Sequence, residues 1–575
     1  MNLTAFMEKK KQEAPIVEKS ETNVIPIKTP TKRSKTIPVG ERNTTLSRRA
    51  GQILKRNGDT AGSRRRFDEL CASCEERLSK AEEDTIYLSA QKFFHNTVEK
   101  SPTYIEPGNY DSPSFAILTD RGYVISAPLL ADYYLERHTV IIETDSGSPR
   151  LYEYQNGVYQ FRTNLEVRAD LGNYINAFRR GLWQSGKIAE AYSAIIHSTS
   201  LHISQKQLNS NPDLVCLVDG LLNLKNWRLL PHDPKIYITR QLDCCFTDIE
   251  IITENFDKYL NRLCENDCAK IQFILQFMGV VFSSVPGWMF KRFLLIIGLK
   301  DSGKTIIKRL MEIFVGEGNY NNCDLYDLET NRFALASLQH KRLSGSNDLR
   351  AVRIPESSKL KQLSGGDSMR AERKGEQDFS MLYDGFICAV GNERPLYGGK
   401  SDEALYQREI LFEVNHSIPL EEQDHHMMDK LLAEKQGIIL KALKASRKAI
   451  YDNDYRFDIP AECERSKVVH RLDNSVVSQF MQECTEAIDL KTMTVKQSEL
   501  QTAAKVWSAF KRWRESCNEY KGITRNDFER EMAVVCGVDL NHIKDIQHSG
   551  NIVGRFYPVK LNNDGLTLNG NEFLQ

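Results

Sequence analysis

The 575-residue sequence has no excess of charge of either sign, because 77 Lys and Arg residues balance 77 Asp and Glu residues. A strong net charge would by itself point to nucleic acid or to a membrane surface. Without it, any contact with nucleic acid has to come from local clusters of basic side chains. The hydrophobic fraction of 41% and the charged fraction of 27% are typical of folded globular proteins.

Long apolar runs are also missing from the sequence. The longest stretches, residues 293–298 and 271–283, are shorter than the ~18 residues that a membrane-spanning helix needs. The N-terminal segment MNLTAFMEKKKQEAP has neither the apolar core nor the small-residue cleavage site of a secretory signal. We therefore expect a cytoplasmic protein that has no membrane partner.

The cysteines do not form the pattern of a disulfide framework. Their number, 13, is odd, and they are scattered along a long chain, which is typical of free thiols in a reducing compartment. Two close pairs, Cys71 with Cys74 and Cys264 with Cys268, leave zinc binding open as an alternative. Neither pair has a second ligand pair at zinc spacing, so we expect buried thiols on helix faces.

The length predicts roughly three to five modules. Residues 1–40 are rich in Lys, Glu, Thr and Pro, which predicts a disordered basic arm that is either solvated or in contact with DNA. Residues 41–104 predict a helical module, and one of its helices ends at Gly58. The apolar residues that share one face of that helix are Leu46, Ala50 and Leu54.

Residues 105–252 mix strand and helix signals, which predicts an α+β domain. The run RLYEYQNGVYQF alternates apolar and polar residues around Asn156–Gly157, a dipeptide that predicts a hairpin turn. The run NPDLVCLVDGLLNLKNWRLLPHDP has a second predicted turn at Asp219–Gly220. Helical periodicity over residues 254–283 then leads to the segment that carries the chemistry.

That segment, FLLIIGLKDSGKTIIKRLMEIF, reads as an apolar strand, a glycine-rich loop with the spacing of a P-loop, and an amphipathic helix. In a P-loop, backbone N–H groups curl around phosphates, Lys304 neutralises the β and γ oxygens, and Thr305 binds magnesium. The alternative is a glycine-rich turn without a ligand. The segment predicts ATP and Mg²⁺ as cofactors, with the phosphates held by Gly298, Asp301, Ser302, Gly303, Lys304 and Thr305.

Four downstream segments then appear in a fixed order, namely RFALASLQHKRLSGSNDLR, KLKQLSGGDSMRAERKGEQDF, FICAVGNERP and ALYQREILFEV. Their order and spacing resemble the phage and plasmid primase-helicase branch of the superfamily 3 helicases, over residues 290–415. The resemblance implies a P-loop, AAA+-like ATPase core with a parallel sheet over residues 253–455. The run NPDLVCLVDGLLNL is similar to the domain that precedes the helicase in this branch.

The resemblance also implies roles for three residues. Asp348 corresponds to the Walker B acid that binds magnesium, Asn392 to the sensor, and Arg408 to an arginine finger that serves the neighbouring subunit. The run FICAVGN is a buried-strand pattern that ends in one polar residue, as a sensor requires. The run RLSGSND is more polar than the family pattern, so Glu356 stays open as the acid. A loop-capping Asn and a surface Arg are the alternatives for Asn392 and Arg408.

The second segment corresponds to a DNA-contacting hairpin in the family, here Lys361, the Gly365–Gly366–Asp367 turn, Arg373 and Lys374. The run SMRAERKGEQDF brings several cations together around one glycine, which favours contact with DNA phosphates over a solvated turn. The predicted DNA-binding residues are Lys361, Arg370, Arg373 and Lys374.

Residues 456–575 predict three amphipathic helices followed by a strand, which is the order of a winged helix and is similar to the C-terminal domain of the family. Lys511, Arg512 and Arg514 flank Trp513, so this stretch predicts either DNA contact or aromatic core packing with a solvated basic face.

A primase-polymerase needs paired carboxylates on a strand, and the first 150 residues have no such pair. Residues 41–104 nevertheless resemble the module that follows the primase domain. We therefore expect a replicative DNA helicase of a mobile element, without its primase, in the cytoplasm of a bacterial host. The resemblance implies a homo-hexamer that moves 3′ to 5′ on single-stranded and fork DNA, with a separate primase or loader as a further partner. The alternatives are an ATP-binding origin scaffold with little turnover and a P-loop ATPase that remodels proteins.

Overall fold

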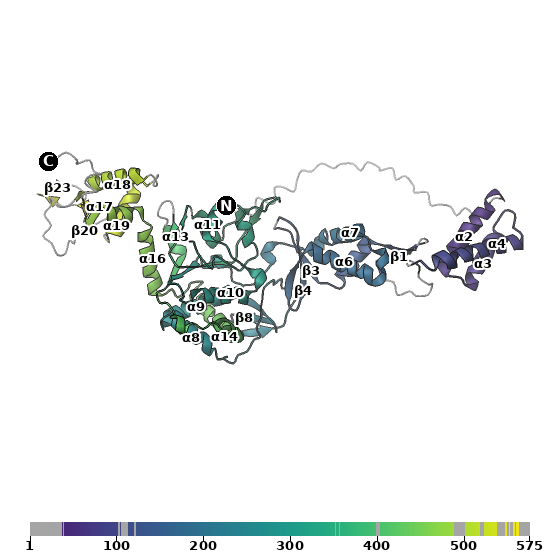
Figure 1. Ribbon diagram of the computed structural model, residues 1–575, viewed down its shortest axis with the longest axis horizontal. Helices are drawn as coiled ribbons and strands as arrows, with labels where there is room; N and C mark the ends of the chain where they lie inside the picture. Colours follow the sequence, from purple (N-terminus) through teal and green to yellow (C-terminus); the bar gives the residue numbers. More distant parts are fainter. Residues whose placement is uncertain are drawn as a thin grey trace, which may run out of the picture. The chain divides into compact units, whose positions relative to one another are not determined.

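The computed structural model has a mixed α/β fold (Figure 1). The described residues separate into two compact units, one made of those within 1–126 and 175–183 and the other of those within 127–174 and 184–575. Almost all of the predicted arm, and Glu356, lie outside the described residues. Among the residues that are described, none of the helices is long and apolar enough to cross a membrane. The description covers residues 37, 39–101, 104, 113–119, 122–145, 147–350, 352–355, 357–375, 377–397, 403–487, 501–517, 523–536, 547–548, 551–552, 556–557 and 559–562.

The first unit contains the predicted helical module, formed by α2 (Arg42–Asn57), α3 (Ala61–Ala72) and α4 (Lys80–Phe93). The predicted apolar face of α2 is confirmed, because its three residues are fully buried: Leu46, Ala50 and Leu54. The helix ends at Gly58, whose φ of 68° favours glycine.

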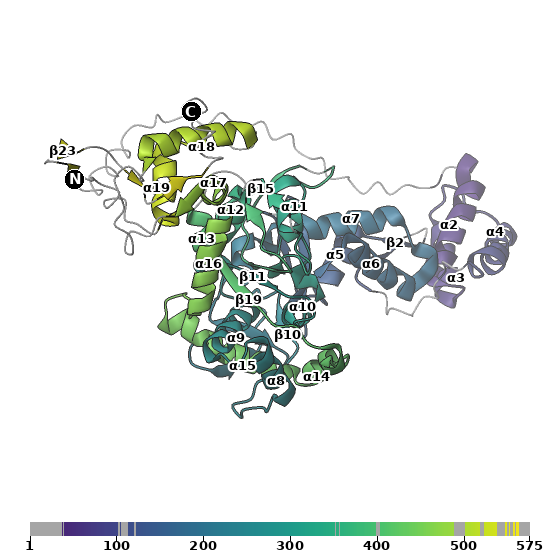
Figure 2. The same cartoon turned by 60° about the vertical axis from the view of Figure 1, so that its left-hand side comes forward.

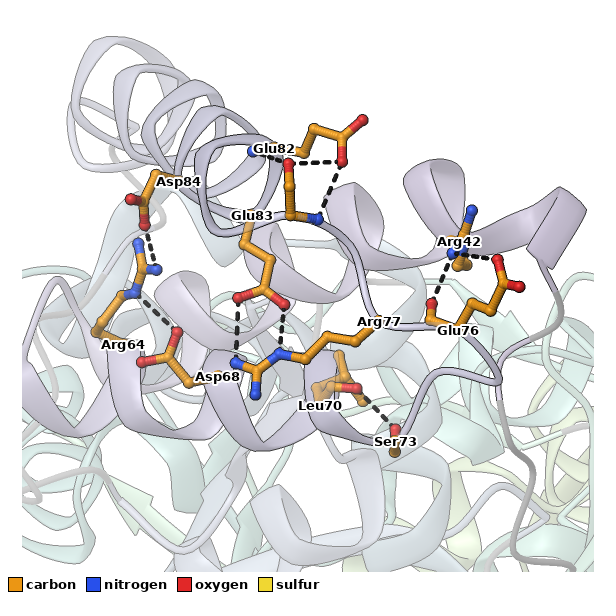
Figure 3. Close-up of polar contacts among 11 residues, drawn as sticks. Arg42, Arg64, Asp68, Leu70, Ser73, Glu76, Arg77, Glu82, Glu83 and Asp84 are labelled. Carbon is orange, nitrogen blue, oxygen red and sulfur yellow. Dashed lines mark hydrogen bonds and ion pairs between the residues drawn. The ribbon is translucent and has the colours of Figure 1, made fainter.

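Ion pairs join the helices of this module (Figure 3). Arg64 of α3 bonds both Asp68 and Asp84, and so connects α3 with α4. Arg77 bonds Glu83 with two nitrogens, at 2.9 and 3.2 Å. Cys71 and Cys74 are buried beside this network. Within the described parts of the chain, no three His, Cys, Asp or Glu side chains gather in a way that could hold a metal ion.

The second unit begins with an α+β region. Its sheet has the order β5-β4-β3-β6, formed by β3 (Val140–Glu143), β4 (Arg150–Gln155), β5 (Val158–Arg162) and β6 (His202–Ile203). The helices of this region are α5 (Ala127–Leu135), α7 (Ser185–Ile196) and the first part of α6 (Asn164–Arg179), whose residues from Ile175 onward belong to the first unit. The predicted hairpin is confirmed between β4 and β5. Asn156 and Gly157 have φ values of 51° and 89°, as a primed two-residue turn requires.

A second small sheet follows, in the order β10-β7-β8-β9. Its strands are β7 (Leu214–Leu217), β8 (Leu221–Asn223), β9 (Arg228–Leu230) and β10 (Gln241–Leu242). The predicted turn at Asp219–Gly220 is confirmed, since Leu217 N donates to Gly220 O at 2.8 Å. A Cβ atom on Gly220 would lie 2.5 Å from Leu230 O, so only glycine fits there.

The centre of the unit is a five-stranded parallel sheet in the order β12-β13-β17-β11-β19. Its neighbouring strands β11 and β19 are labelled in Figure 2. The parallel sheet that the sequence predicts is therefore present. Successive side chains of β11 enter two different hydrophobic clusters, one on each face of the sheet. The strands are β11 (Phe293–Gly298), β12 (Tyr320–Asn321), β13 (Leu343–Ser344), β17 (Phe386–Gly391) and β19 (Glu409–Val414).

Helices cover both faces of this sheet. One cluster includes residues of α8 (Glu254–Leu263), α9 (Cys268–Phe282), α10 (Lys304–Val315) and α15 (Lys435–Arg447). The other includes residues of α11 (Leu325–Thr330) and α12 (Ser358–Gly365). Arg342, only 1% exposed, donates to Val280 O at 2.5 Å and Val281 O at 2.8 Å, which satisfies carbonyls near the end of α9.

The C-terminal residues form α16 (Ala461–Asp473), α17 (Val476–Cys484), α18 (Ala503–Cys517) and α19 (Arg525–Val535). Two strand pairs accompany them, β20 (Thr485–Ala487) with β25 (Val559–Leu561) and β21 (Gln501–Thr502) with β24 (Phe556–Tyr557). Trp513 is 5% exposed and donates to Glu483 at 2.8 Å, so it belongs to the core, whereas Lys511 and Arg512 are exposed. The winged-helix assignment stays a prediction.

Candidate functional site

The predicted phosphate loop connects β11 to α10. Gly298 lies against the neighbouring strand β19, where a Cβ atom would be 2.0 Å from Val414 O. Asp301 and Gly303 have φ values of 57° and 84°, which turn the chain sharply. Gly303 is also the N-cap of α10. Because glycine has no side chain, no N-cap side chain bonds to the N–H groups of the first helical turn. This geometry leaves backbone N–H groups and the positive end of the helix dipole available to an anion.

Lys304, the first residue of α10, is only 6% exposed. Its Nζ donates to Leu299 O at 2.7 Å and to Asn392 Oδ1 at 2.8 Å. Burial lowers the pKa of Lys304, while the charges of Asp301 and Asp348 act to raise it. The structure thus brings three predicted site residues together: Lys304, Asp348 and Asn392.

A cavity of about 460 Å³ opens beside the loop, and Thr305 lines it. Ser302 is 2% exposed, and its hydroxyl has no hydrogen-bond partner among the described residues. A buried polar atom of this kind fits an absent polar ligand, such as a phosphate oxygen. The other lining residues include Tyr259, Asp301, Ile418 and Met427.

Tyr259 contributes to the site but was not predicted from the sequence. It belongs to α8, is 6% exposed, and its hydroxyl donates to Gly303 O at 3.0 Å. Burial raises the pKa of Tyr259. In the sequence it lies within a helical apolar pattern, so only the contact reveals its role in holding the loop.

Asp348 and Asn392 lie at the same edge of the sheet as the loop. Strand β13 is short, but the chain continues beside β17, because Val390 N donates to Ser346 O at 2.9 Å and Leu349 N to Val390 O at 2.7 Å. Asp348 is therefore level with the end of β17, after which Asn392 follows, and both side chains are exposed. Parallel strands present residues that follow them at a common edge, which is where such folds bind ligands.

The polar character of the segment RLSGSND has a physical explanation. Lys308 of α10 is fully buried, and its Nζ contacts Glu312 at 2.5 Å and Asn347 Oδ1 at 3.0 Å. Asn347 also donates to Glu312 at 3.2 Å. The polar residue before Asp348 thus satisfies a buried ion pair instead of extending an apolar strand.

Arg408 lies at the opposite edge of the sheet. It is the last residue of α13 (Glu403–Arg408) and directly precedes β19. The register pairs Phe293 with Glu409 and Gly298 with Val414, so the start of β19 and the phosphate loop are separated by the length of the strand, about 16 Å. Arg408 donates to Ala404 O within its own helix at 2.9 Å. The sheet therefore separates Arg408 from Lys304 within one chain.

A hairpin is present, formed by β15 (Met369–Ala371) and β16 (Phe379–Met381), which pair antiparallel. The predicted Gly365–Gly366–Asp367 turn is not part of it, because Gly365 ends helix α12 and Gly366 is the C-cap of that helix. Arg370 pairs with Asp378 at 2.6 Å, and the Arg373 guanidinium lies 4.6 Å from the ring centre of Phe379. Lys374 is exposed and precedes Gly375, whose φ is 82°. Lys361 lies on α12, before the hairpin. Their contact with DNA stays a prediction.

Comparison with known proteins gives two family matches. Residues 129–283 match the family described as D5 N terminal like, and residues 296–408 match a family of unknown function (DUF5906). The second match begins within β11 and ends at Arg408, so it contains most of the candidate site.

Solved structures of the NrS-1 C-terminal region are also similar. The A form apo structure has 12% identity and a TM-score of 0.41, and the match covers 72% of this chain and 86% of that chain. A second A form apo structure, of residues 305–718, has 13% identity and a TM-score of 0.41, and the match covers 72% and 87%. The D5 N terminal like match covers residues that precede the phosphate loop, whereas the loop and the motifs that follow it lie within the DUF5906 match or directly beside it.

Proposed function

We propose that this protein is an ATP-dependent replicative DNA helicase of a mobile genetic element, which assembles as a homo-hexameric ring. The observation that carries the proposal is the distribution of the candidate site's side chains over the two edges of the parallel sheet. Lys304 and Asn392 are in contact at the carboxyl edge, whereas Arg408 lies at the amino edge, about 16 Å away by strand length. An ATPase whose sites lie between subunits needs this separation.

The carboxyl edge suits an NTP with magnesium. Lys304 binds β and γ oxygens of the phosphates, the uncapped first turn of α10 supplies N–H donors, and Ser302 supplies a hydroxyl. When bound, Mg²⁺ supplies positive charge to the phosphate oxygens and is held by Thr305 and Asp348. Magnesium usually keeps several waters and takes one or two protein ligands besides phosphate, so this small donor set is sufficient.

Asn392 and Arg408 complete the proposed machinery. Asn392 is exposed beside Lys304 and orients the attacking water or the γ-phosphate. Arg408 of the next subunit stabilises the charge that develops on the phosphate during transfer. The hairpin of Arg370, Arg373 and Lys374, with Lys361 of α12, follows one DNA strand as ATP is hydrolysed.

DNA-stimulated ATP hydrolysis by the purified full-length chain tests the proposal. We expect turnover that requires Mg²⁺, rises several-fold with single-stranded DNA, and is accompanied by the separation of a forked duplex. An origin-binding scaffold would bind ATP and DNA without turnover. A protein-remodelling ATPase would hydrolyse ATP at a rate that does not respond to DNA. Either result contradicts the helicase assignment.

A further inference from the structure

Helix α16, which connects the ATPase core to the C-terminal helices, has a polar buried face. It runs beside β19 of the parallel sheet (Figure 2). Its buried residues are Cys463, Ser466 and His470, whereas Val468 and Val469 are 53% and 45% exposed. A helix usually packs through an apolar stripe. Besides the apolar packing of Cys463, this one is joined to the sheet by directed hydrogen bonds and ion pairs, which fix its position more specifically than apolar contact does.

His470 makes two of these bonds. Its Nδ1 lies 2.7 Å from Glu409 Oε1 and its Nε2 lies 2.7 Å from Pro395 O. Both partners are acceptors, so only the doubly protonated imidazolium supplies a donor to each. Glu409 is 1% exposed, and its second oxygen accepts from the hydroxyl of Tyr397 at 2.7 Å. The Glu409 carboxylate is thus held from two sides.

Glu409 directly follows Arg408 in the chain and is the first residue of β19. Because both oxygens of the Glu409 carboxylate are bonded, the backbone at Glu409 is held in place. The position of the adjacent Arg408 backbone, from which its side chain extends, is then held as well. Among the described helices, α16 is the one that hydrogen-bonds to the Glu409 carboxylate, since the other bond comes from Tyr397, outside the helices.

Residues of α16 on either side of His470 reach the nucleotide side of the same strand. Arg394, two residues after Asn392, bonds Glu413 of β19 at 2.7 Å and Asp473 of α16 at 2.8 Å. Ser466 donates to the other oxygen of Glu413 at 2.7 Å. One helix therefore contacts the segment that follows the sensor of its own site and the strand that follows the finger for the next site.

We propose that α16 is the positioning element of Arg408, acting through the bond from His470 to Glu409, and that it links the sensor of one subunit to the finger presented to the next. The inference rests on the proposed function, because it needs Arg408 to act across a subunit boundary. His470 is a positioning residue and does not touch nucleotide.

Subunit mixing distinguishes this role from a general structural one. His470→Ala keeps its own phosphate loop but presents a misplaced finger, and Lys304→Ala keeps an intact finger without a working loop. Mixed rings contain interfaces in which the intact loop of the first faces the intact finger of the second. We expect His470→Ala alone to lose about 10- to 100-fold in single-turnover hydrolysis, since a displacement of 1 Å costs on the order of 100-fold. Its ATP affinity should stay unchanged, and the mixture should recover activity.

Three further variants keep the test decisive. Tyr397→Phe removes a single hydroxyl from the Glu409 carboxylate and should give a smaller loss of the same kind. His470→Gln retains one donor and should recover part of the activity. Val469→Ala changes an exposed residue of the same helix and should behave as wild type.

The outcomes separate the inference from the proposed function. Recovery by Arg408→Ala with Lys304→Ala, but not by His470→Ala or Tyr397→Phe with Lys304→Ala, overturns the positioning role and leaves the ring intact. Weaker ATP binding in His470→Ala and Tyr397→Phe also overturns it, because the defect then lies in the subunit's own site. If none of the three mixtures with Lys304→Ala recovers activity, Arg408 does not act in the neighbouring subunit, and the inference is wrong as well.

Discussion

The two edges of the five-stranded parallel sheet are held in different ways. At the carboxyl edge, backbone conformation shapes the site, because Gly298 allows a close approach to β19 and Gly303 turns the chain into α10. At the amino edge, Arg408 is followed by Glu409, the first residue of β19. The Glu409 side chain is bonded by His470, which lies 61 residues further along the chain.

This difference has a consequence for mechanism. A loop shaped mainly by its own backbone depends on few other contacts, here the bond from Tyr259 to Gly303 O and the close approach of Gly298 to β19, and this suits tight binding of phosphate. An arginine whose position depends on a distant helix responds to whatever moves that helix. We therefore expect substitutions at the carboxyl edge to abolish the chemistry within a subunit, and substitutions at the amino edge to affect its neighbour.

The largest effect should follow the loss of the loop cation. We expect Lys304→Ala to reduce ATP turnover to background with an intact fold, because it removes the charge on the β and γ oxygens. Turnover by a phosphate-release assay and circular dichroism measure the two properties. Lys300→Ala, in the same loop but exposed, is the control and should stay active. Normal hydrolysis by Lys304→Ala would show that the loop does not bind phosphate catalytically.

The next largest effect is expected at the amino edge, at Arg408. Arg408→Ala alone should lose roughly 10³ to 10⁵ in hydrolysis rate, the usual contribution of an arginine finger. Mixed with Lys304→Ala, it should regain activity above either parent, because some interfaces then join an intact loop to an intact finger. Single-turnover hydrolysis is the suitable measurement. Arg309→Ala, an exposed arginine of α10, is the control. Subunits that exchange without recovery would mean that Arg408 does not act in trans.

The acid at the carboxyl edge gives the third test. Asp348→Asn should bind ATP normally but hydrolyse it about 100-fold more slowly, since magnesium or water is no longer positioned while the phosphate loop is unchanged. Binding of a fluorescent ATP analogue and turnover separate these properties. Asp327→Asn, which changes an acid that pairs with Arg350, is the control. If Glu356→Gln, not Asp348→Asn, stops hydrolysis, the acid lies one element later.

These edges also differ in how far the sequence predicts them. The loop, the turn at Asn156–Gly157 and the hairpin of β15 and β16 depend on residues close together in the chain, so short patterns were sufficient. The contact of Lys304 with Asn392 joins residues 88 apart, and only the resemblance to a family suggested it.

The remaining contacts had no pattern to reveal them. Tyr259 looks like part of an apolar helix face, and the bond to Gly303 appears only when α8 packs beside the loop. The residue before Asp348 looked too polar for its strand because its partners, Lys308 and Glu312, are buried on a neighbouring helix. The role of His470 depends on an acceptor far away in the sequence.

A smaller effect is expected at the hairpin, which belongs to neither edge. Lys374→Ala should weaken single-stranded DNA binding about 3- to 10-fold, because it removes a single phosphate contact. For the same reason, the slope of the logarithm of the binding constant against the logarithm of the salt concentration should become shallower by about one. ATP hydrolysis without DNA should be unchanged. Fluorescence anisotropy over a series of salt concentrations measures both quantities. Lys225→Ala, an exposed lysine in the turn between β8 and β9, is the control, and equal behaviour of the two variants would contradict a DNA role for Lys374.

The smallest effect concerns the stability of the amino edge against pH. Burial acts to lower the pKa of His470 and Arg394 does the same, but the charge of Glu409 and the bonds to Glu409 and Pro395 prevail, so the pKa is raised. A raised pKa means that the folded state binds the proton more tightly than the unfolded state does. The stabilisation is therefore fully present below the unfolded pKa of about 6.5, and is lost as the pH rises through the folded value.

The measurement is the midpoint of thermal unfolding of wild type and His470→Gln between pH 6 and pH 9. Wild type should be more stable than the variant at pH 6, and the difference should shrink by about 2–4 °C towards pH 9, the shift that about 1 kcal/mol gives in a domain of roughly 200 residues. The comparison with the variant removes the contributions of other groups that titrate in this range. The stability of Lys304→Ala relative to wild type should follow no such trend near pH 6.5, because a lysine ordinarily titrates at about pH 10.4. A difference between wild type and His470→Gln that grows with pH would mean that His470 is neutral in the folded protein, and the charged bond that holds Glu409 would then be absent.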